Sequence, residues 1–204
     1  MKILRACRFI IAVSSICIII TIPFLFSFWN KNTVEFSIPE KFNSILTTSR
    51  GESDSIYRLG RTTIVFFGFT RCRGICPKIL NELQNFLEED HDCSIEVTFI
   101  SIDPSDTESD LLRFEQIYNY QVRAFHGSIQ TIQTMAEILR APFYLPAPGN
   151  IEKAVINHTS RATILREDGR NAILLENPTA KRLHEEITKR NICYATVDEK
   201  PRTF

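Results

Sequence analysis

No charge of one sign dominates this sequence. Lysine and arginine together number 24, and aspartate and glutamate also number 24. The chain therefore has no excess of positive charge with which to collect phosphates, and we expect no nucleic-acid partner. Internal repeats and low-complexity tracts are absent as well, so the 204 residues suit one compact domain of ordinary size.

Cysteine is scarce beyond the N-terminal region. Two of the six cysteines, Cys7 and Cys17, lie near the N-terminus, and the others are Cys72, Cys76, Cys93 and Cys193. Four cysteines are too few for a fold that depends on disulfides. Cys93 and Cys193 could pair, remain lone buried thiols or become oxidised adventitiously, and the sequence does not decide among these states.

Charge is absent altogether from Phe9 to Trp29, a run of 21 residues. This length is what a helix needs to cross about 30 Å of hydrocarbon, so we predict an uncleaved transmembrane helix. A cleaved signal peptide would have an apolar region of about 7–15 residues before a small-residue cleavage site, and neither is present. Lipoprotein processing at Cys17 is disfavoured because Ile16 precedes it where a small residue is expected.

The charges on either side of this run predict its orientation. Lys2, Arg5 and Arg8 precede it without an acidic residue among them, whereas mixed charges follow it. The positive-inside rule then places the N-terminus in the cytoplasm and the C-terminal domain on the periplasmic or extracytoplasmic side of a single-pass membrane protein. No presequence rich in arginine and serine precedes the run, which favours a bacterial cytoplasmic membrane.

The remaining chain predicts an α/β domain. Residues 63–69 and 95–102 are β-branched and aromatic, as in buried strands, and an amphipathic helix over 77–89 joins them. Further helices are predicted after Thr107, over 128–140 and after Pro178, and a hairpin is predicted from 161–166 and 171–175 around Gly169. The prolines of residues 141–157 predict an extended loop.

This order predicts a thioredoxin-like sandwich, a βαβ half followed by a ββα half, with additional helix between them. The predicted organisation is a cytoplasmic N-terminus and transmembrane anchor (1–29), a tether and N-terminal edge segment (30–62), the thioredoxin-like domain (63–190) and a C-terminal tail (191–204). Ligands of open α/β sheets bind beyond the carboxyl ends of the strands, and Cys72 follows such an end.

Cys72 and Cys76 lie where a strand runs through a loop into a helix. Unpaired N–H groups at the helix N-terminus and the charges of Arg71 and Arg73 predict lowered thiol pKa values and reactive cysteines. Gly74 allows a local change of the loop, so the pair could close into a disulfide or, when open, hold one metal ion between two soft sulfurs. Structural zinc is disfavoured because no second close cysteine pair is present.

His158 follows the proline-rich loop and immediately precedes the hairpin, where a thioredoxin-like fold returns beside its active loop. It could therefore reach the two thiols. A histidine at a loop end is, taken alone, more often a solvated or packed side chain, but its pairing with the two cysteines favours a ligand. His91, His126 and His184 have no cysteine beside them, and we expect them to be solvated surface residues.

Three sequence blocks together resemble the SCO/SenC family: Phe67-Gly68-Phe69-Thr70 leading into Cys-x-x-x-Cys-Pro, Ser101-Ile102-Asp103-Pro104 with Asp106-Thr107, and Asn157-His158-Thr159. The resemblance implies that Cys72, Cys76 and His158 bind Cu(I) or Cu(II). It also implies a role in assembling the dinuclear copper centre of cytochrome c oxidase. Asp103 is then a candidate to orient the site or to contact an arginine near the thiols, although ordinary turn and helix-start chemistry would also explain it.

The chain departs from the family pattern Thr-His-Cys-Pro-Asp-x-Cys, since it has Thr70-Arg71-Cys72-Arg73-Gly74-Ile75-Cys76. The ligands are kept, but their surroundings are more basic and the loop is more flexible, so copper affinity or partner choice could differ.

Two functions follow from the same residues. The first is a metallochaperone whose partners are the copper-bearing subunit of cytochrome c oxidase and other copper chaperones. The second is a thiol–disulfide oxidoreductase that reduces cysteines of a partner protein or exchanges electrons with thiol reductases. An enzymatic role is thus left open, and nothing in the sequence favours a sensor that acts by binding alone.

Overall fold

The computed structural model describes residues 33–88, 94–119, 121–144, 157–158 and 160–192. The chain divides into two compact units, Met1–Val34 and Glu35–Phe204, and the fold described below is that of the second. No helix within the described ranges is long and apolar enough to cross a membrane. The predicted transmembrane helix, Phe9–Trp29, lies outside these ranges.

A sheet of eight strands forms the centre of the second unit, in the order β1-β10-β9-β4-β5-β6-β2-β3. Its middle is parallel and consists of β4 (Thr62–Gly68), β5 (Ile95–Ser101) and β6 (Val122–His126). All seven residues of β4 are buried. A strand of β-branched and aromatic residues suits this position because parallel central strands are covered on both faces.

The outer strands are antiparallel to their inner neighbours wherever a pairing register is defined. The hairpin of β9 (Arg161–Leu165) and β10 (Asn171–Glu176) pairs with β4 through β9. The residue that turns this hairpin is Gly169, whose φ of 64° suits glycine. On the opposite side β2 (Ile45–Thr48) pairs with β6 and with β3 (Ser53–Ser55), and β1 (Thr33–Ser37) lies beside β10.

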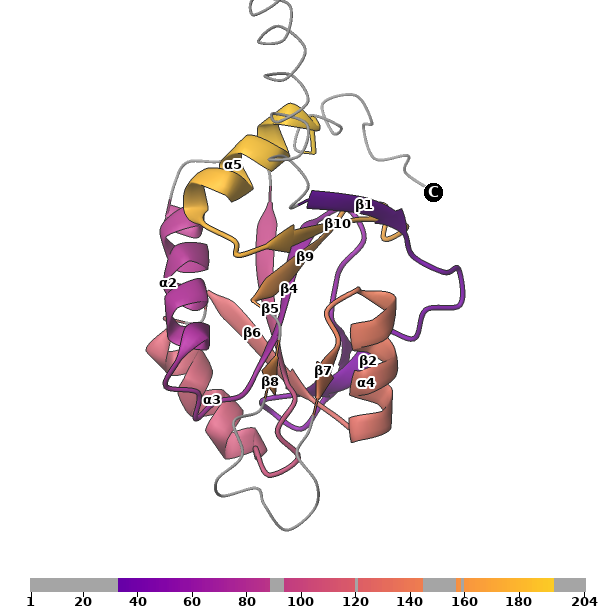
Figure 1. The fold of residues 1–204 in the computed structure, drawn as a ribbon. Helices are drawn as coiled ribbons and strands as arrows, with labels where there is room; N and C mark the ends of the chain where they lie inside the picture. Colours follow the sequence, from indigo (N-terminus) through magenta and orange to yellow (C-terminus); the bar gives the residue numbers. More distant parts are fainter. Residues whose placement is uncertain (1–32, 89–93, 120, 145–156, 159, 193–204) are drawn as a thin grey trace, which may run out of the picture. The chain divides into compact units, whose positions relative to one another are not determined.

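Helices cover both faces of the sheet (Figure 1). On one face lie α2 (Ile75–Glu88), α3 (Glu108–Ile117) and α5 (Ala180–Lys189), and on the other lies α4 (Ile129–Ile138). Thr107, Ser128 and Thr179 cap α3, α4 and α5 with their hydroxyl groups, and Thr107 forms a full capping box with Asp110.

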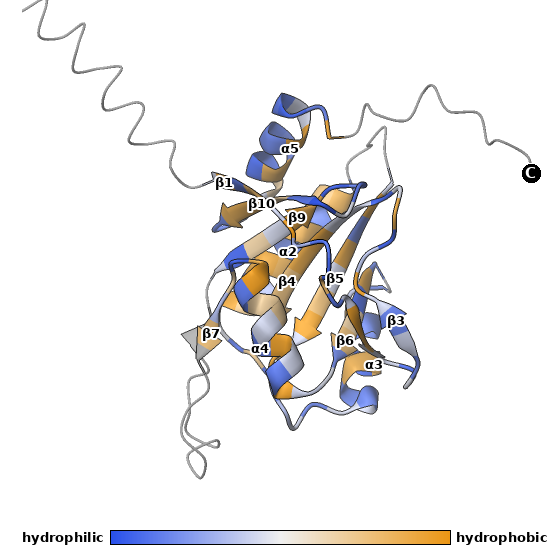
Figure 2. Ribbon diagram, turned by 90° about the vertical axis from the view of Figure 1, so that its right-hand side faces the viewer, coloured by the Kyte–Doolittle hydropathy of each residue, from blue (hydrophilic) through white to orange (hydrophobic). Residues whose placement is uncertain are grey.

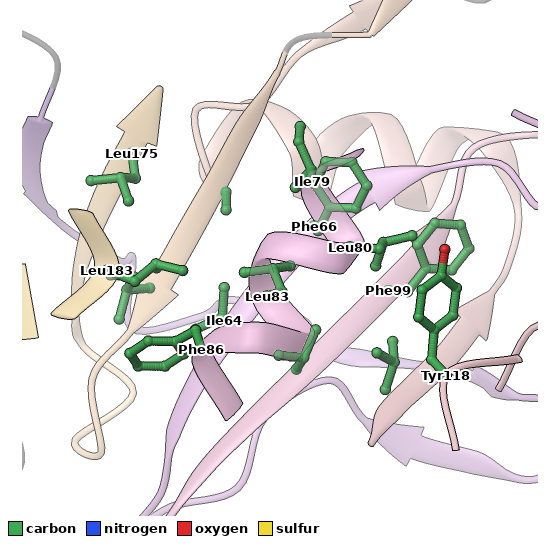
Figure 3. Packing of buried hydrophobic residues seen from close by; sticks show 14 of the residues in the cluster. Ile64, Phe66, Ile79, Leu80, Leu83, Phe86, Phe99, Tyr118, Leu175 and Leu183 are labelled. Atoms are coloured by element: carbon green, nitrogen blue, oxygen red, sulfur yellow. The ribbon is translucent and has the colours of Figure 1, made fainter. Parts of the chain in front are cut away.

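Each face of the sheet has its own hydrophobic core, because successive side chains of a strand point to opposite sides. Ile64 and Phe66 pack with α2, α3 and α5, whereas Val65 and Phe67 pack with α4 and the N-terminal strands. Figure 3 shows the first core, with Leu80 and Leu83 of α2 and Leu183 of α5 among its members. Hydrophobic residues dominate the central strands, while polar residues predominate on α5 (Figure 2).

The structure confirms the thioredoxin-like βαβ and ββα halves and the hairpin, but the sequence-based prediction missed β6. This strand has only five residues, and the charged Arg123 interrupts its apolar pattern. Its position is set by pairing with β5 and by Glu115 of α3, whose buried carboxylate accepts a hydrogen bond from the Ala124 N–H at 2.7 Å. Neither contact is visible in the local sequence.

The loop predicted over 141–157 lies partly outside the described ranges, at residues 145–156. Within them Phe143–Tyr144 forms β7, which pairs with β8, Asn157–His158. His126 is also not the solvated surface residue that we predicted. It ends β6, its side chain is only 23% exposed, and its Nε2 lies 3.4 Å from Glu108 Oε1.

Candidate thiol and metal site

The site lies where two neighbouring parallel strands end. Gly68 of β4 is in register with Ser101 of β5, and the Ile102 N–H donates to the Gly68 carbonyl at 2.8 Å. The cysteine loop, residues 69–74, leaves β4 and carries Cys72. The Asp-Pro loop, residues 102–107, leaves β5 and carries Asp103. The topology of the sheet therefore brings the cysteine loop and the Asp-Pro loop together, as expected at the carboxyl edge of such a sheet.

The two cysteines differ in exposure. Cys72 lies in the loop, is half-buried, and its N–H donates to the Phe69 carbonyl at 3.1 Å. Cys76 lies in the first turn of α2 and is only 1% exposed. Both are free thiols, and their side chains are hydrogen-bonded to each other. The sulfur that a partner can reach from solvent is therefore that of Cys72.

Cys76 fits against the sheet because residue 68 is glycine. A Cβ atom at Gly68 would lie 3.1 Å from Cys76 Sγ and 2.8 Å from Phe99 Cε2. Glycine within a strand marks such a close approach, and this signal could have identified Gly68 from the sequence.

Replacing Gly68 with alanine should therefore disturb both the core and the thiol pair. We expect the free energy of unfolding to fall by about 1–3 kcal/mol, since a methyl group is forced into a packed interior. Urea unfolding followed by circular dichroism measures this change. Gly74→Ala is the matched control, because no atom lies within 4 Å of a Cβ built there. An equal effect of the two substitutions would contradict the packing argument.

The pKa of Cys76 is raised, contrary to the prediction from the helix N-terminus and the arginines. Burial is the main cause, and the hydrogen bond to Cys72 and the charge of Cys72 act in the same direction. Backbone hydrogen bonds of Phe69 and of Cys76 itself lower the pKa, but by less. The prediction was wrong for Cys76 because it counted positive charges in the sequence without the cost of burying an anion.

Arg71 is engaged by carboxylates of the loop that follows β5. Its Nη2 donates to Asp103 Oδ2 at 2.7 Å and also contacts the Ser105 hydroxyl, and Asp106 Oδ1 lies 3.7 Å away. The pKa of Arg71 is raised chiefly by the hydrogen bond to Asp103. The arginine that stands in this chain's cysteine loop is thus bound to the neighbouring Asp-Pro loop.

Asp106 ties the same two loops together from inside the protein. Its side chain is fully buried. It accepts hydrogen bonds from the Thr70 N–H at 2.9 Å, the Thr70 hydroxyl at 2.7 Å and the Ser101 hydroxyl at 2.6 Å. In the sequence Asp106 is only part of an Asp-Thr motif, and the sequence pattern does not reveal that it binds the loop two residues before Cys72.

The Asp103 carboxylate is expected to make stability depend on pH. Burial would raise its pKa, but hydrogen bonds from Ser105 and from Arg71 outweigh burial, so the pKa is lowered. A carboxyl group whose folded pKa lies below its unfolded value of about 3.9 stabilises the protein above that value, and the contribution disappears as pH falls through the folded pKa.

Asp103→Asn should therefore lower the free energy of unfolding by about 1–3 kcal/mol at pH 7, and the difference from the parent chain should shrink below about pH 4. Urea unfolding at a series of pH values between 7 and the acid limit of folding tests this. A difference that stays constant with pH would contradict the assigned role of the charge.

A mostly apolar groove of about 290 Å³ contains both cysteines. It runs between α2 and α3 and is lined by Phe69, Thr70, Cys72, Cys76, Pro77, Leu80, Phe114, Ile117 and Tyr118. The Tyr118 pKa is raised, first by burial and then by the nearby Cys76 and Cys72. Figure 3 shows Tyr118 close to Leu80 and Phe99 on this side of the sheet. Tyr118 was not predicted as part of the site, since it belongs to no motif.

Another cleft of about 310 Å³ lies elsewhere, beside β6 and β2, and its lining includes Arg58, Asp54 and Arg123. Arg123 pairs with Asp54 at 2.6 Å, and Arg58 lies 3.3 Å from Glu96. No cysteine lines this second cleft, and its charged side chains form ion pairs. The groove with the thiols is therefore the better candidate for chemistry.

The donor set for a metal is incomplete within the described ranges, where no group of three or more His, Cys, Asp or Glu side chains could hold an ion. The two thiols are together. His158 is placed through its backbone, which pairs with Phe143 across β7 and β8, and its side chain lies outside the description. Cys93 and Cys193 also lie outside it.

The fold and the free cysteine pair define this chain as a thioredoxin-like thiol protein. Comparison with known proteins then gives its family: the model of the SCO1/SenC family matches residues 31–192. The chain belongs to the SCO1/SenC family.

Individual relatives are distant. Human "Protein SCO1 homolog, mitochondrial" is 28% identical over 132 residues, which are 61% of this chain and 43% of the human protein. The crystal structure of yeast Sco1 with copper bound matches with a TM-score of 0.64 at 19% identity, over 84% of this chain and 95% of that one. BsSco, described as having a disulfide switch and as a member of a family of cytochrome c oxidase assembly proteins, matches with a TM-score of 0.58 at 18% identity, over 80% and 100%. At identities below 20%, the likeness to these two structures establishes the fold alone.

Proposed function

We propose that this chain binds one copper ion through Cys72 and Cys76 and delivers it to, or prepares, the dinuclear copper site of cytochrome c oxidase. The observation that carries the proposal is the pair of free thiols, hydrogen-bonded to each other at the carboxyl edge of the sheet. Membership of the SCO1/SenC family supports it, as does the bound copper in the yeast relative's structure.

The chemistry of the donors fits copper as a cargo. Two thiolate sulfurs are soft ligands that favour Cu(I), and a site with few ligands can pass its ion to an acceptor. Because Cys76 is buried with a raised pKa, binding requires that its proton leave as the ion enters. Oxygen-preferring ions such as Mg²⁺ and Ca²⁺ would gain little from this pair.

His158 is the proposed third ligand, and Asp103 is the proposed supporting residue. Imidazole nitrogen suits both Cu(I) and Cu(II), so His158 would let the site hold the ion in either state. Asp103 would act through Arg71, to which it is bound at 2.7 Å, and so fix the loop that carries Cys72.

The proposed location is the outer side of a cytoplasmic membrane, with residues 9–29 as a single anchor. The proposed partner is the copper-bearing subunit of cytochrome c oxidase, with other copper chaperones or thiol reductases as suppliers of copper or electrons. Support for the anchor comes from its uncharged sequence and from the basic residues before it.

Copper titration of the reduced whole chain in mild detergent tests the proposal. With Cu(I) supplied from a competing chelator under nitrogen, we expect one ion per chain. A variant without Cys7, Cys17, Cys93 and Cys193 should still bind one ion, whereas Cys72→Ser/Cys76→Ser should bind none at the same chelator concentration. Binding that follows the other four cysteines would overturn the site.

A thiol–disulfide oxidoreductase is the second candidate, and the contact between the two thiols favours it. An accessible sulfur beside a buried one is suited to forming a mixed disulfide that the second sulfur then resolves. A Cys76→Ser chain should trap a partner protein covalently at Cys72 in cells, and Cys72→Ser should not. Equal trapping by both variants would contradict this function.

A further inference from the structure

The groove that contains the thiols continues beyond them between two helices. Leu80 and Pro77 of α2 form one wall, and Phe114, Ile117 and Tyr118 form the other. Ile117 is 71% exposed, so its side chain offers apolar surface to an incoming ligand at the groove. The apolar surface thus extends from the sulfurs toward the end of α3.

Exposed cations adjoin the groove lining in the sequence, although carboxylates are also close by, since Asp103, Asp106 and Asp110 act on Arg71. Arg73 and Lys78 are exposed and adjoin the lining residues Cys72 and Pro77 in sequence. Within the ranges that the structure describes, neither forms an ion pair, whereas the Arg71 guanidinium is bound by Asp103 and lies close to Asp106. Arg73 and Lys78 are thus cations within one residue of the lining and would complement a negatively charged ligand at the groove.

A group that exchanges metal or electrons with this site has to enter the groove. Cys76 is 1% exposed, so the approach is to Cys72, whose sulfur shares the groove with the apolar walls. The residues that flank an incoming cysteine would then lie against Leu80, Phe114 and Ile117. Burying their apolar surface there would contribute to binding.

We propose that this groove docks a cysteine-bearing segment of the partner protein, with apolar residues next to the cysteine and acidic residues outside them. The inference rests on the proposed function and specifies the kind of segment that the site accepts. The α2 and α3 walls select the apolar residues, and Arg73 and Lys78 select the acidic ones.

A disulfide-exchange reaction measures docking directly. The probe is the synthetic peptide Gly-Asp-Leu-Cys-Leu-Asp-Gly, its cysteine activated as a 2-thiopyridyl disulfide. The Cys72 thiolate attacks the peptide sulfur, the new disulfide joins Cys72 to the peptide, and the old sulfur–sulfur bond breaks. Pyridine-2-thione leaves with a proton, and the proton of Cys72 goes to solvent. The absorbance of the thione gives the rate.

Each rate is divided by the rate with 2,2′-dithiodipyridine, a small neutral reagent that reports the reactivity of Cys72 without docking. The rate of a Cys72→Ser chain is subtracted, because the other cysteines also react. We expect the parent peptide to react about tenfold faster, by this ratio, than a peptide with serine for both leucines or lysine for both aspartates.

Variants of the whole chain test which side chains contribute to docking. Ile117→Ser should lower the ratio for the parent peptide by about tenfold, since it removes apolar surface from the groove without adding a charge that would attract the aspartates. Leu59→Ser is the matched control: Leu59 is 74% exposed and precedes the amino end of β4, whereas Cys72 follows the carboxyl end of that strand. Arg73→Glu/Lys78→Glu should reverse the preference, so that the lysine peptide reacts faster than the parent.

Equal ratios for the three peptides, or an Ile117→Ser chain that keeps the parent ratio, would overturn the docking surface. A preference that Leu59→Ser abolishes as strongly as Ile117→Ser would also overturn it. Copper titration of the same chain separates this result from the proposed function. A chain that binds one copper ion but shows no selectivity contradicts docking alone, and a chain that binds none contradicts the proposed function.

Discussion

Cys76→Ser is expected to lower the Cu(I) affinity of the reduced chain by about a thousandfold, which corresponds to ~4 kcal/mol of binding. The hydroxyl of serine is a hard, poorly ionised ligand, and Cu(I) prefers thiolate. Cys76 is also the buried member of the pair, so little solvent is available to replace the lost ligand. Competition with a chelator of known affinity, under nitrogen, measures the change.

The comparison with His158→Ala makes this prediction specific. Two thiolates can still hold Cu(I) without an imidazole, so we expect a smaller loss, of about 10–100-fold, by analogy with the removal of groups that support a metal site. Cys193→Ser is the matched control and should leave affinity at the parent value. If Cys76→Ser and Cys193→Ser had the same affinity, the site would have to lie elsewhere in the chain.

Asp106→Ala is expected to lower the free energy of unfolding by about 3–4 kcal/mol. Hydrogen bonds to a charged acceptor contribute roughly 1.5–3 kcal/mol each, although the contributions of one residue do not add fully. The substitution leaves the Thr70 N–H, the Thr70 hydroxyl and the Ser101 hydroxyl without their acceptor at a fully buried position. Urea unfolding of the whole chain in mild detergent measures the loss.

A second effect of the same substitution would link stability to the site. Thr70 lies two residues before Cys72, so releasing it should loosen the loop and expose Cys76, which is 1% accessible in the intact protein. Alkylation of Cys76 by iodoacetamide, followed by mass spectrometry under folding conditions, should become faster. Ser101→Ala removes only one of the three bonds to Asp106 and should cost about 1.5–2 kcal/mol with little change in alkylation.

If Asp106→Ala and Ser101→Ala had the same effect on both measurements, the carboxylate would not be what holds the loop. A slower alkylation in Asp106→Ala would likewise contradict the role of Asp106. Asp106→Asn offers an intermediate case, because its amide oxygen can still accept a hydrogen bond while its charge is lost.

The amino-acid sequence by itself determined the elements whose signals are local. The uninterrupted β-branched and aromatic run of β4, the amphipathic face of α2, the hydroxyl of Thr107 before α3 and the glycine at 169 each predict their structure from a few neighbouring residues. The same is true of the cysteine pair, because its place between a buried strand and a helix is a matter of spacing along the chain.

Only the tertiary structure decided what surrounds those residues. β6 depends on its ladder with β5 and on the buried Glu115 of α3, which also accepts from the Ser49 hydroxyl at 2.8 Å. The raised pKa of Cys76 follows from burial against Gly68, and the charge of Arg71 is directed to Asp103 on a loop 32 residues away. These properties depend on contacts between distant segments and on the loss of water around them, neither of which is encoded in local spacing.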